Sequence, residues 1–218
     1  MPFALPAISR KAFASTLRRL SPEPLDERAI DALHAHYDEL GRWNQRLSLI
    51  GPGTADEILS RHYGEALAAL PLVPPEAGQG VDVGSGAGFP GLVLAAARPD
   101  LTMTLVEARE RKWSFLLAAA RKALLPCRCL NARVSLPLPT GLPESIDLVT
   151  ARALKLDPQV LGAFASRLGS EGRILLWVGE QDPDLPPGLV PAGSVRLEGS
   201  ERRRIVELRR SPSGPEAE

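Results

Sequence analysis

The chain has 218 residues, of which 44% are hydrophobic, so it is long enough to bury one sizeable core. Its formal net charge of zero argues against bulk electrostatic attraction to nucleic acid but leaves local basic patches open. No apolar run approaches the roughly 18 residues of a membrane span, and no secretory signal is evident, so we expect a cytoplasmic protein without membrane contact. Two cysteines and three histidines are too few for a zinc site, and we predict no metal.

The N-terminal part of the sequence has the patterns of helices. Residues 1–21 are weakly patterned, and we expect them to be partly helical or mobile. Apolar residues recur at a helical period over about 24–46, behind prolines and acidic residues that suit a helix start. Thr54, with Glu57 three residues later, predicts the capping box of a second helix. The segment PLVPPEAGQG then predicts a linker.

From residue 80 onward, strand and helix signals alternate. The predicted elements are strand 80–83, helix 89–97, strand 102–107, helix 110–124, strands 127–130 and 147–152, helix 157–168 and strand 173–178. This alternation predicts a mostly parallel sheet covered by helices on both faces. The end, VRLEGSERRRIVELRR, instead predicts an antiparallel hairpin. We therefore divide the chain into a helical N-terminal extension (1–72), an α/β domain (73–210) and a disordered tail (211–218).

The segment VDVGSGAGFPG removes side chains from the turn that follows the first predicted strand. Gly84, Gly86 and Gly88 let the backbone pass close to a ligand at the carboxyl end of that strand. A nucleoside-like cofactor suits such a turn. One interpretation uses Gly86, Gly88 and Gly91 as a dinucleotide fingerprint, with Glu107 near the position of the ribose-binding acid.

A second interpretation begins at Asp82, because D-x-G-x-G-x-G resembles motif I of the S-adenosylmethionine-dependent methyltransferases. A carboxylate at this strand end would be unfavourable near a pyrophosphate and favourable near the ammonium and sulfonium charges of S-adenosylmethionine. The C-terminal hairpin matches the antiparallel last strand typical of these methyltransferases. This interpretation is the better one, and it gives Glu107 the ribose hydroxyls.

More of the chain resembles the ribosomal small-subunit methyltransferase G family, also called GidB, over most of residues 37–180. The matching segments are RWNQRLSLI (42–50), RHYGEAL (61–67), VDVGSGAGFPGL (81–92), LVEARERKWSFL (105–116), ARV (132–134) and TARAL (150–154). The resemblance implies an α/β, Rossmann-like class I methyltransferase fold with a mostly parallel seven-stranded sheet and a helical N-terminal extension. It also implies methyl transfer from S-adenosylmethionine to N7 of one guanine of 16S rRNA, in the small ribosomal subunit or its precursor, by a monomer.

The resemblance also carries site residues over by position. The implied cofactor site comprises Asp82, Gly84, Gly86, Gly88, Phe89, Glu107, Val134, Ser135, Leu136 and Arg152. Arg152 would meet either the methionine carboxylate or an RNA phosphate. With Arg61 and Lys112, which are candidates for phosphate contact, Arg152 forms the implied catalytic set. Guanine N7 loses no proton on methylation, so positioning and electrostatics suffice and no general base is required.

Three positions depart from the family pattern. Glu65 stands where the family usually has aspartate, Ser135 and Leu136 replace two acidic residues, and Val178 replaces a lysine near the expected substrate mouth. Two other functions remain open on the residues. One is a nicotinamide-dependent oxidoreductase, and the other is a non-catalytic RNA-binding protein that retains the methyltransferase fold.

Overall fold

A seven-stranded sheet forms the centre of the computed structural model, which describes residues 3–51 and 57–211. Its strands are β1 (Gln79–Val83), β2 (Thr102–Glu107), β3 (Arg128–Asn131), β4 (Ile146–Arg152), β5 (Leu168–Val178), β6 (Leu189–Arg196) and β7 (Arg204–Arg210). The strand order is β3-β2-β1-β4-β5-β7-β6. Strands β1 to β5 pair in parallel, whereas β7 runs antiparallel to both β5 and β6. The predicted parallel sheet with a C-terminal hairpin is confirmed.

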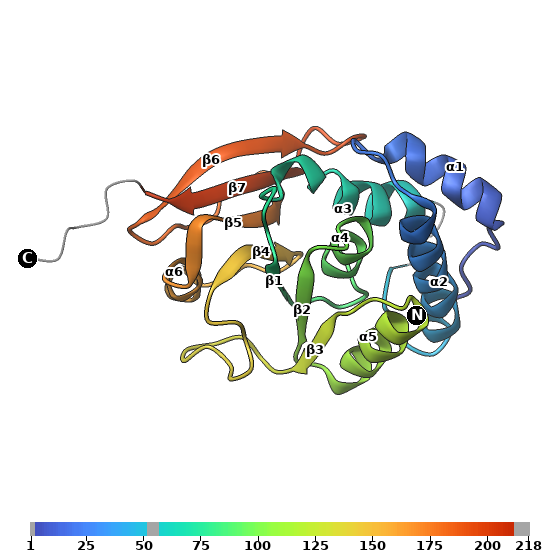
Figure 1. Ribbon diagram of the computed structural model, residues 1–218, viewed down its shortest axis with the longest axis horizontal. Coiled ribbons are helices and arrows are strands. Elements are labelled where there is room, and N and C mark those ends of the chain that lie inside the picture. The colour runs from blue at the N-terminus through green and yellow to red at the C-terminus, as the bar shows by residue number, and fades with distance from the viewer. Residues whose placement is uncertain (1–2, 52–56, 212–218) are drawn as a thin grey trace, which may run out of the picture.

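Helices cover both faces of this sheet (Figure 1). They are α1 (Arg10–Leu20), α2 (Glu27–Asn44), η2 (Leu59–Gly64), α3 (Glu65–Leu67), η3 (Leu70–Leu72), α4 (Gly91–Ala97), α5 (Glu110–Lys122) and α6 (Pro158–Ala165). Successive strand residues point to opposite faces. Leu148 of β4 accordingly packs with the N-terminal helices, α4 and α5, whereas Val149 packs with α6. Within the described ranges, no helix has the length and apolar character needed to cross a bilayer.

The N-terminal helices share one hydrophobic core with the sheet domain. Phe13 of α1, Tyr37 of α2, Leu92 of α4 and Phe115 of α5 are all buried in the same cluster. The boundary between a helical extension and an α/β domain at residue 72 stays a prediction. The hydrophobic core continues across this boundary.

Two local structures differ from the sequence expectations. The segment after α2 was expected to form an ordinary helix, but η2 is a six-residue π-helix followed by one short α-helical turn. Apolar periodicity does not reveal which backbone hydrogen bonds form, and π-helical turns often occur at functional sites. The expected cap residue, Thr54, lies outside the described residues. Strand β6 begins earlier than expected, because the sheet edge accommodates Pro191 at a register shift.

His36 joins the N-terminal helices to the glycine turn after β1. Its side chain is completely buried, with Nδ1 2.7 Å from the Tyr63 hydroxyl and Nε2 2.9 Å from the Ala87 carbonyl oxygen. The carbonyl can only accept, so Nε2–H donates to Ala87 and the Tyr63 hydroxyl donates to Nδ1. A Cβ at Gly88 would lie 3.1 Å from Nε2, so this close approach favours glycine there. Burial lowers the pKa of His36 to about 4, and the ring is neutral at neutral pH.

We expect His36 to make the fold sensitive to acid. Its folded pKa of about 4 lies below the ordinary 6.5, so the unfolded chain binds a proton first and stability falls as pH drops from about 6.5 to about 4. In His36→Gln, the loss of unfolding free energy between pH 7.5 and 4.5 should be smaller by about 2 to 3 kcal/mol. Urea denaturation at the two pH values measures this. Equal losses in both proteins would contradict the assignment.

Candidate functional site

A cavity of about 490 Å³ lies where the parallel strands β1 to β4 end. It is lined by residues 83–87 and Phe89 after β1, 106–109 and Lys112 after β2, 132–134 after β3, 152–154 after β4, and by Leu49, Ile50 and His62. The carboxyl ends of parallel strands are where open α/β sheets bind ligands. The cavity therefore lies where the sequence predicted the cofactor.

The glycine turn brings backbone, without side chains, to the edge of this cavity. Gly84 has φ 72° and Gly88 has φ 87°, conformations that L-residues with a Cβ rarely adopt. A Cβ at Gly84 would lie 3.2 Å from the Leu154 side chain, which lines the cavity after β4. Side chains therefore pack closely against the turn at two glycines: Leu154 against Gly84 and His36 against Gly88.

Glu107, at the end of β2, connects the turn to the opposite wall of the cavity. Its Oε2 accepts a hydrogen bond from the Gly86 N–H at 3.0 Å, and its Oε1 accepts one from the Arg109 N–H at 2.8 Å. The side chain is 7% exposed and lines the cavity. Each carboxylate oxygen retains a second lone pair, so Glu107 can still accept hydrogen bonds from a ligand's hydroxyl groups.

Asp82 lies beneath the turn and does not line the cavity. Its Oδ1 accepts a 2.6 Å hydrogen bond from the Thr150 hydroxyl, and its carbonyl oxygen accepts one from the Ser85 hydroxyl at 2.9 Å. Burial raises the pKa of Asp82 to about 6. A Cβ at Gly91 would lie 2.5 Å from the Asp82 Cβ, so that glycine allows α4 to pack against β1. The sequence interpretation required the Asp82 carboxylate to face the ligand. In this structure the carboxylate is buried beneath the turn, so its contact with a cofactor stays a prediction.

Arg152 reaches the cavity from the end of β4 and is held by several acceptors. One of its terminal nitrogens, Nη2, donates to Glu65 Oε2 at 2.7 Å and to the Arg61 carbonyl at 2.6 Å, and the other lies 3.4 Å from the His62 carbonyl. Glu65 is 5% exposed and also pairs with Arg203 and, at 3.5 Å, with Arg61. Burial and the charge of Arg61 lower the pKa of Arg152 to about 10. We call Glu65, Arg61, Arg152 and Arg203 the Glu65 network.

Further cations face the same cavity. Arg109, Lys112 and Arg133 line it together with Arg152, whereas Glu107 contributes the one carboxylate among the described lining residues. Lys112 and Arg152 were predicted as site residues, whereas Arg109 and Arg133 were not. Arg133 lies within the ARV segment that carried the resemblance. The segment therefore indicated this part of the site, but it did not assign a role to the arginine side chain.

Aromatic rings form the wall nearest the N-terminal helices. Phe89 lines the cavity and packs against His62, with ring centroids 5.1 Å apart, and against Tyr63 at 5.0 Å. Burial, with a smaller effect of Arg152, lowers the pKa of His62 to about 3. The His62 ring is therefore neutral at neutral pH and contributes a flat surface without a charge.

The structure brings most of the predicted site residues together. Gly84, Gly86, Phe89, Glu107, Lys112, Val134 and Arg152 line the cavity. Arg61 lies just behind it, through its carbonyl bond to Arg152. Gly88, Ser135 and Leu136 do not line the cavity, and their contact with a cofactor stays a prediction.

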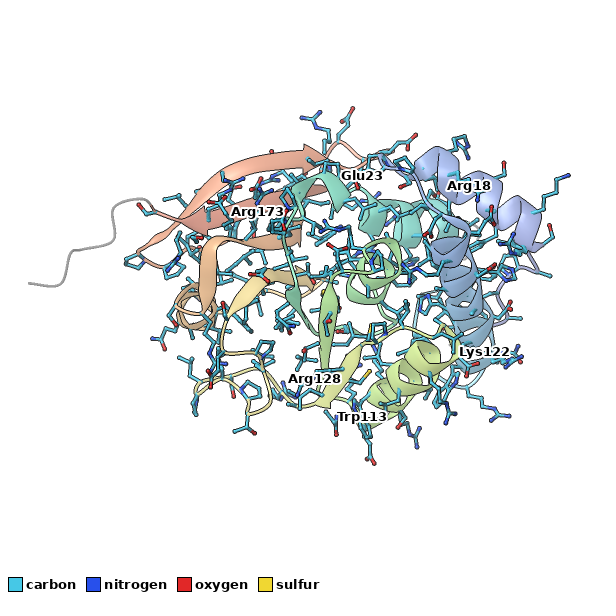
Figure 2. All side chains as sticks on the ribbon, viewed as in Figure 1. Arg18, Glu23, Trp113, Lys122, Arg128 and Arg173 are labelled. Carbon is cyan, nitrogen blue, oxygen red and sulfur yellow. The ribbon has the colours of Figure 1, made fainter. Side chains whose placement is uncertain are left out.

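Trp113 and Trp43 both make packing contacts within the protein. The Trp113 indole donates to the Cys129 carbonyl where α5 meets β3 (Figure 2), and Trp43 packs on Phe115 with centroids 6.0 Å apart.

We predict that Glu107→Gln weakens S-adenosylmethionine binding at least about tenfold, or about 1.4 kcal/mol. An amide cannot accept both backbone N–H bonds and the ligand's hydroxyl groups in the same way, because one of its two polar atoms is a donor. Isothermal titration calorimetry measures the affinity, with Glu110→Gln on α5, outside the cavity, as the matched control. Equal affinities of Glu107→Gln and the wild type would remove Glu107 from the cofactor site.

Solved structures share this fold. TrmN from Thermus thermophilus is 22% identical, with a TM-score of 0.52 over 70% of this chain and 53% of that one. MtNAS in complex with MTA and tNA is 14% identical, with a TM-score of 0.56 over 93% and 76%. At these identities the likeness concerns the fold alone, and it confirms the predicted class I methyltransferase architecture.

Sequence comparison identifies the family. The family model described as rRNA small subunit methyltransferase G matches residues 29–184. The protein named ribosomal RNA small subunit methyltransferase G from Paramagnetospirillum magneticum is 36% identical over 76% of this chain and 78% of its own length. The protein of the same name from Desulfotalea psychrophila is 33% identical over 88% of both chains. The chain belongs to the rRNA small subunit methyltransferase G family.

Proposed function

We propose that this methyltransferase modifies N7 of one guanine of 16S rRNA. The observation that carries the proposal is the charge of the cavity, where Arg109, Lys112, Arg133 and Arg152 surround the one carboxylate of the described lining, Glu107. Cations of this kind position RNA phosphates. Glu107 already accepts two backbone hydrogen bonds, so the cavity is built for positioning and charge rather than for removing a proton.

The family assignment confirms S-adenosylmethionine as the predicted cofactor, and the cavity suits it. The Gly84–Gly86 backbone gives close access, Glu107 retains lone pairs for hydroxyl groups, and Phe89 offers an aromatic wall. Bound there, the cofactor supplies an electrophilic methyl group on a sulfonium sulfur. The residues that would hold it lie at the ends of β1 and β2, two adjacent strands that the sheet fixes relative to one another.

The other residues of the cavity orient the reactants. Guanine N7 has an in-plane lone pair and loses no proton, so in-line placement is the main requirement. Glu65 and the two η2 carbonyls fix the Arg152 guanidinium at the end of β4. The His62 ring, neutral because burial lowers its pKa to about 3, does not compete with N7 for protons or add a cation.

Three further expectations stay predictions. These are the small ribosomal subunit or its precursor as the form of the substrate, a monomeric enzyme and a cytoplasmic location. The family assignment does not favour the oxidoreductase. A protein that binds RNA without turnover is separated from the enzyme by the following experiment.

The decisive experiment uses small ribosomal subunits from cells that lack the homologous methyltransferase. They are incubated with the protein and methyl-labelled S-adenosylmethionine, and the label is mapped by nuclease digestion. We expect label on N7 of a single guanine of 16S rRNA. Label on another atom or another RNA would contradict the proposal, and cofactor binding without label would favour the non-catalytic alternative.

A further inference from the structure

A second cavity, of about 770 Å³, borders the Glu65 network. It lies between the end of α1, the η2 and α3 turns, and the connection between β6 and β7, which approaches α1 in Figure 1. We call it the arginine groove and define it by its charged lining residues, which are Arg19, Arg61, Arg196, Arg203, Glu57, Glu65 and Glu198. The groove joins the N-terminal helices to the C-terminal hairpin, two parts of the chain that lie far apart in sequence.

Positive charge is in excess around this groove. Four arginines and three glutamates line it, and one of these glutamates, Glu65, also has to balance Arg152 of the neighbouring cavity. Arg19 and Arg196 are exposed, and their side chains have no ion pair or hydrogen bond within residues 3–51 and 57–211. Arg19 and Arg196 are therefore available to bind an anion at the rim of the groove. Glu65, at its base, already pairs with several arginines.

Arg203 is a partly buried cation of the groove, and the protein satisfies only part of its guanidinium. Its Nη1 pairs with Glu65, and the rest of its guanidinium has no side-chain or backbone acceptor in the described part of the chain. Burial and the nearby charge of Arg61 lower the pKa of Arg203. The Nε of Arg61 is itself buried without a hydrogen-bond partner, 3.5 Å from Glu65. A second anion between Arg61 and Arg203 would satisfy both guanidiniums.

We propose that the arginine groove binds the phosphodiester backbone of the rRNA strand that carries the target guanine. Arg203 contacts a phosphate at the base of the groove, and Arg19 and Arg196 contact its neighbours at the rim. The assignment rests on the proposed function. It gives the RNA strand a path from the groove, past Glu65 and Arg152, to the methyl-transfer cavity.

This path has a consequence for recognition. Arginine contacts to phosphates carry no sequence information, but they fix the register of the strand. The Glu65 network spans both cavities, so a strand anchored in the groove would present its next nucleotides at the cofactor cavity. The N-terminal helices and the β6–β7 connection thereby form part of the RNA-binding surface.

The test compares Arg203→Gln with its neighbour Arg202→Gln. The Arg202 side chain is 77% exposed, pairs with Glu180 and does not line the groove, so it is a matched control for charge. Affinity for unmethylated small subunits is measured as a function of salt. We expect Arg203→Gln to bind about tenfold more weakly and to lower the slope of log affinity against log salt by about 0.7 to 1, whereas Arg202→Gln changes neither.

Two further measurements keep the result interpretable. S-adenosylmethionine affinity of Arg203→Gln should match the wild type at a temperature below the variant's own thermal midpoint, which shows that the variant is folded although Glu65 has lost one of its partners. Should this variant fail to fold, the double variant Arg19→Gln/Arg196→Gln, at exposed positions, decides. It removes two phosphate contacts, so we expect its affinity to fall by at least about tenfold and its slope by about 1.4 to 2.

An unchanged salt slope in Arg203→Gln, or an equal loss in Arg202→Gln, would overturn the groove assignment. The proposed function fails separately, when the wild-type protein places no label on the rRNA of the same subunits. The two failures are therefore distinguishable in one set of samples.

Discussion

The buried carboxylate of Glu65 is the interaction on which the arrangement of the functional surfaces depends. It lies at the start of α3 and holds arginines from η2, β4 and the β6–β7 connection, while its backbone carbonyl accepts the Trp177 indole N–H from β5 at 2.9 Å. Removing the partner of a buried charge leaves the other charge uncompensated, which is strongly destabilising. This one side chain therefore links the N-terminal helices, the sheet and the C-terminal hairpin, and it lies between the two cavities.

The cofactor cavity depends on a second set of contacts, which fix the backbone. His36 holds the Ala87 carbonyl from the side of the N-terminal helices, and Glu107 holds the Gly86 N–H from the neighbouring strand. Asp82 supports the same turn by accepting the Ser85 hydroxyl on its carbonyl oxygen, while Thr150 of β4 donates to its carboxylate. The helical extension thus lines the candidate cofactor cavity and also shares the hydrophobic core, and its rings pack directly on Phe89.

The fold and the position of the site could be predicted from the sequence, because both leave local patterns. Alternating strand and helix signals predicted the sheet, and the glycine turn with Glu107 predicted the place of the cavity. The contacts that organise the site could not be predicted in this way. His36 is one polar residue on an amphipathic helix, and its partner Ala87 is 51 positions away. Arg203 was visible only as part of a basic run, because its pairing with Glu65 depends on how the hairpin packs.

We infer that Glu65 acts on methyl transfer by holding Arg152 at the cavity. A double-mutant cycle of Glu65→Gln and Arg152→Gln tests it most directly, with kcat/KM measured on unmethylated small subunits at a temperature where all four proteins are folded. We predict strong coupling, so that the two substitutions together slow the reaction much less than the product of their single effects, although Glu65 also pairs with Arg203. Effects of the two substitutions that simply multiply would show that Glu65 and Arg152 act independently, and would contradict the claim.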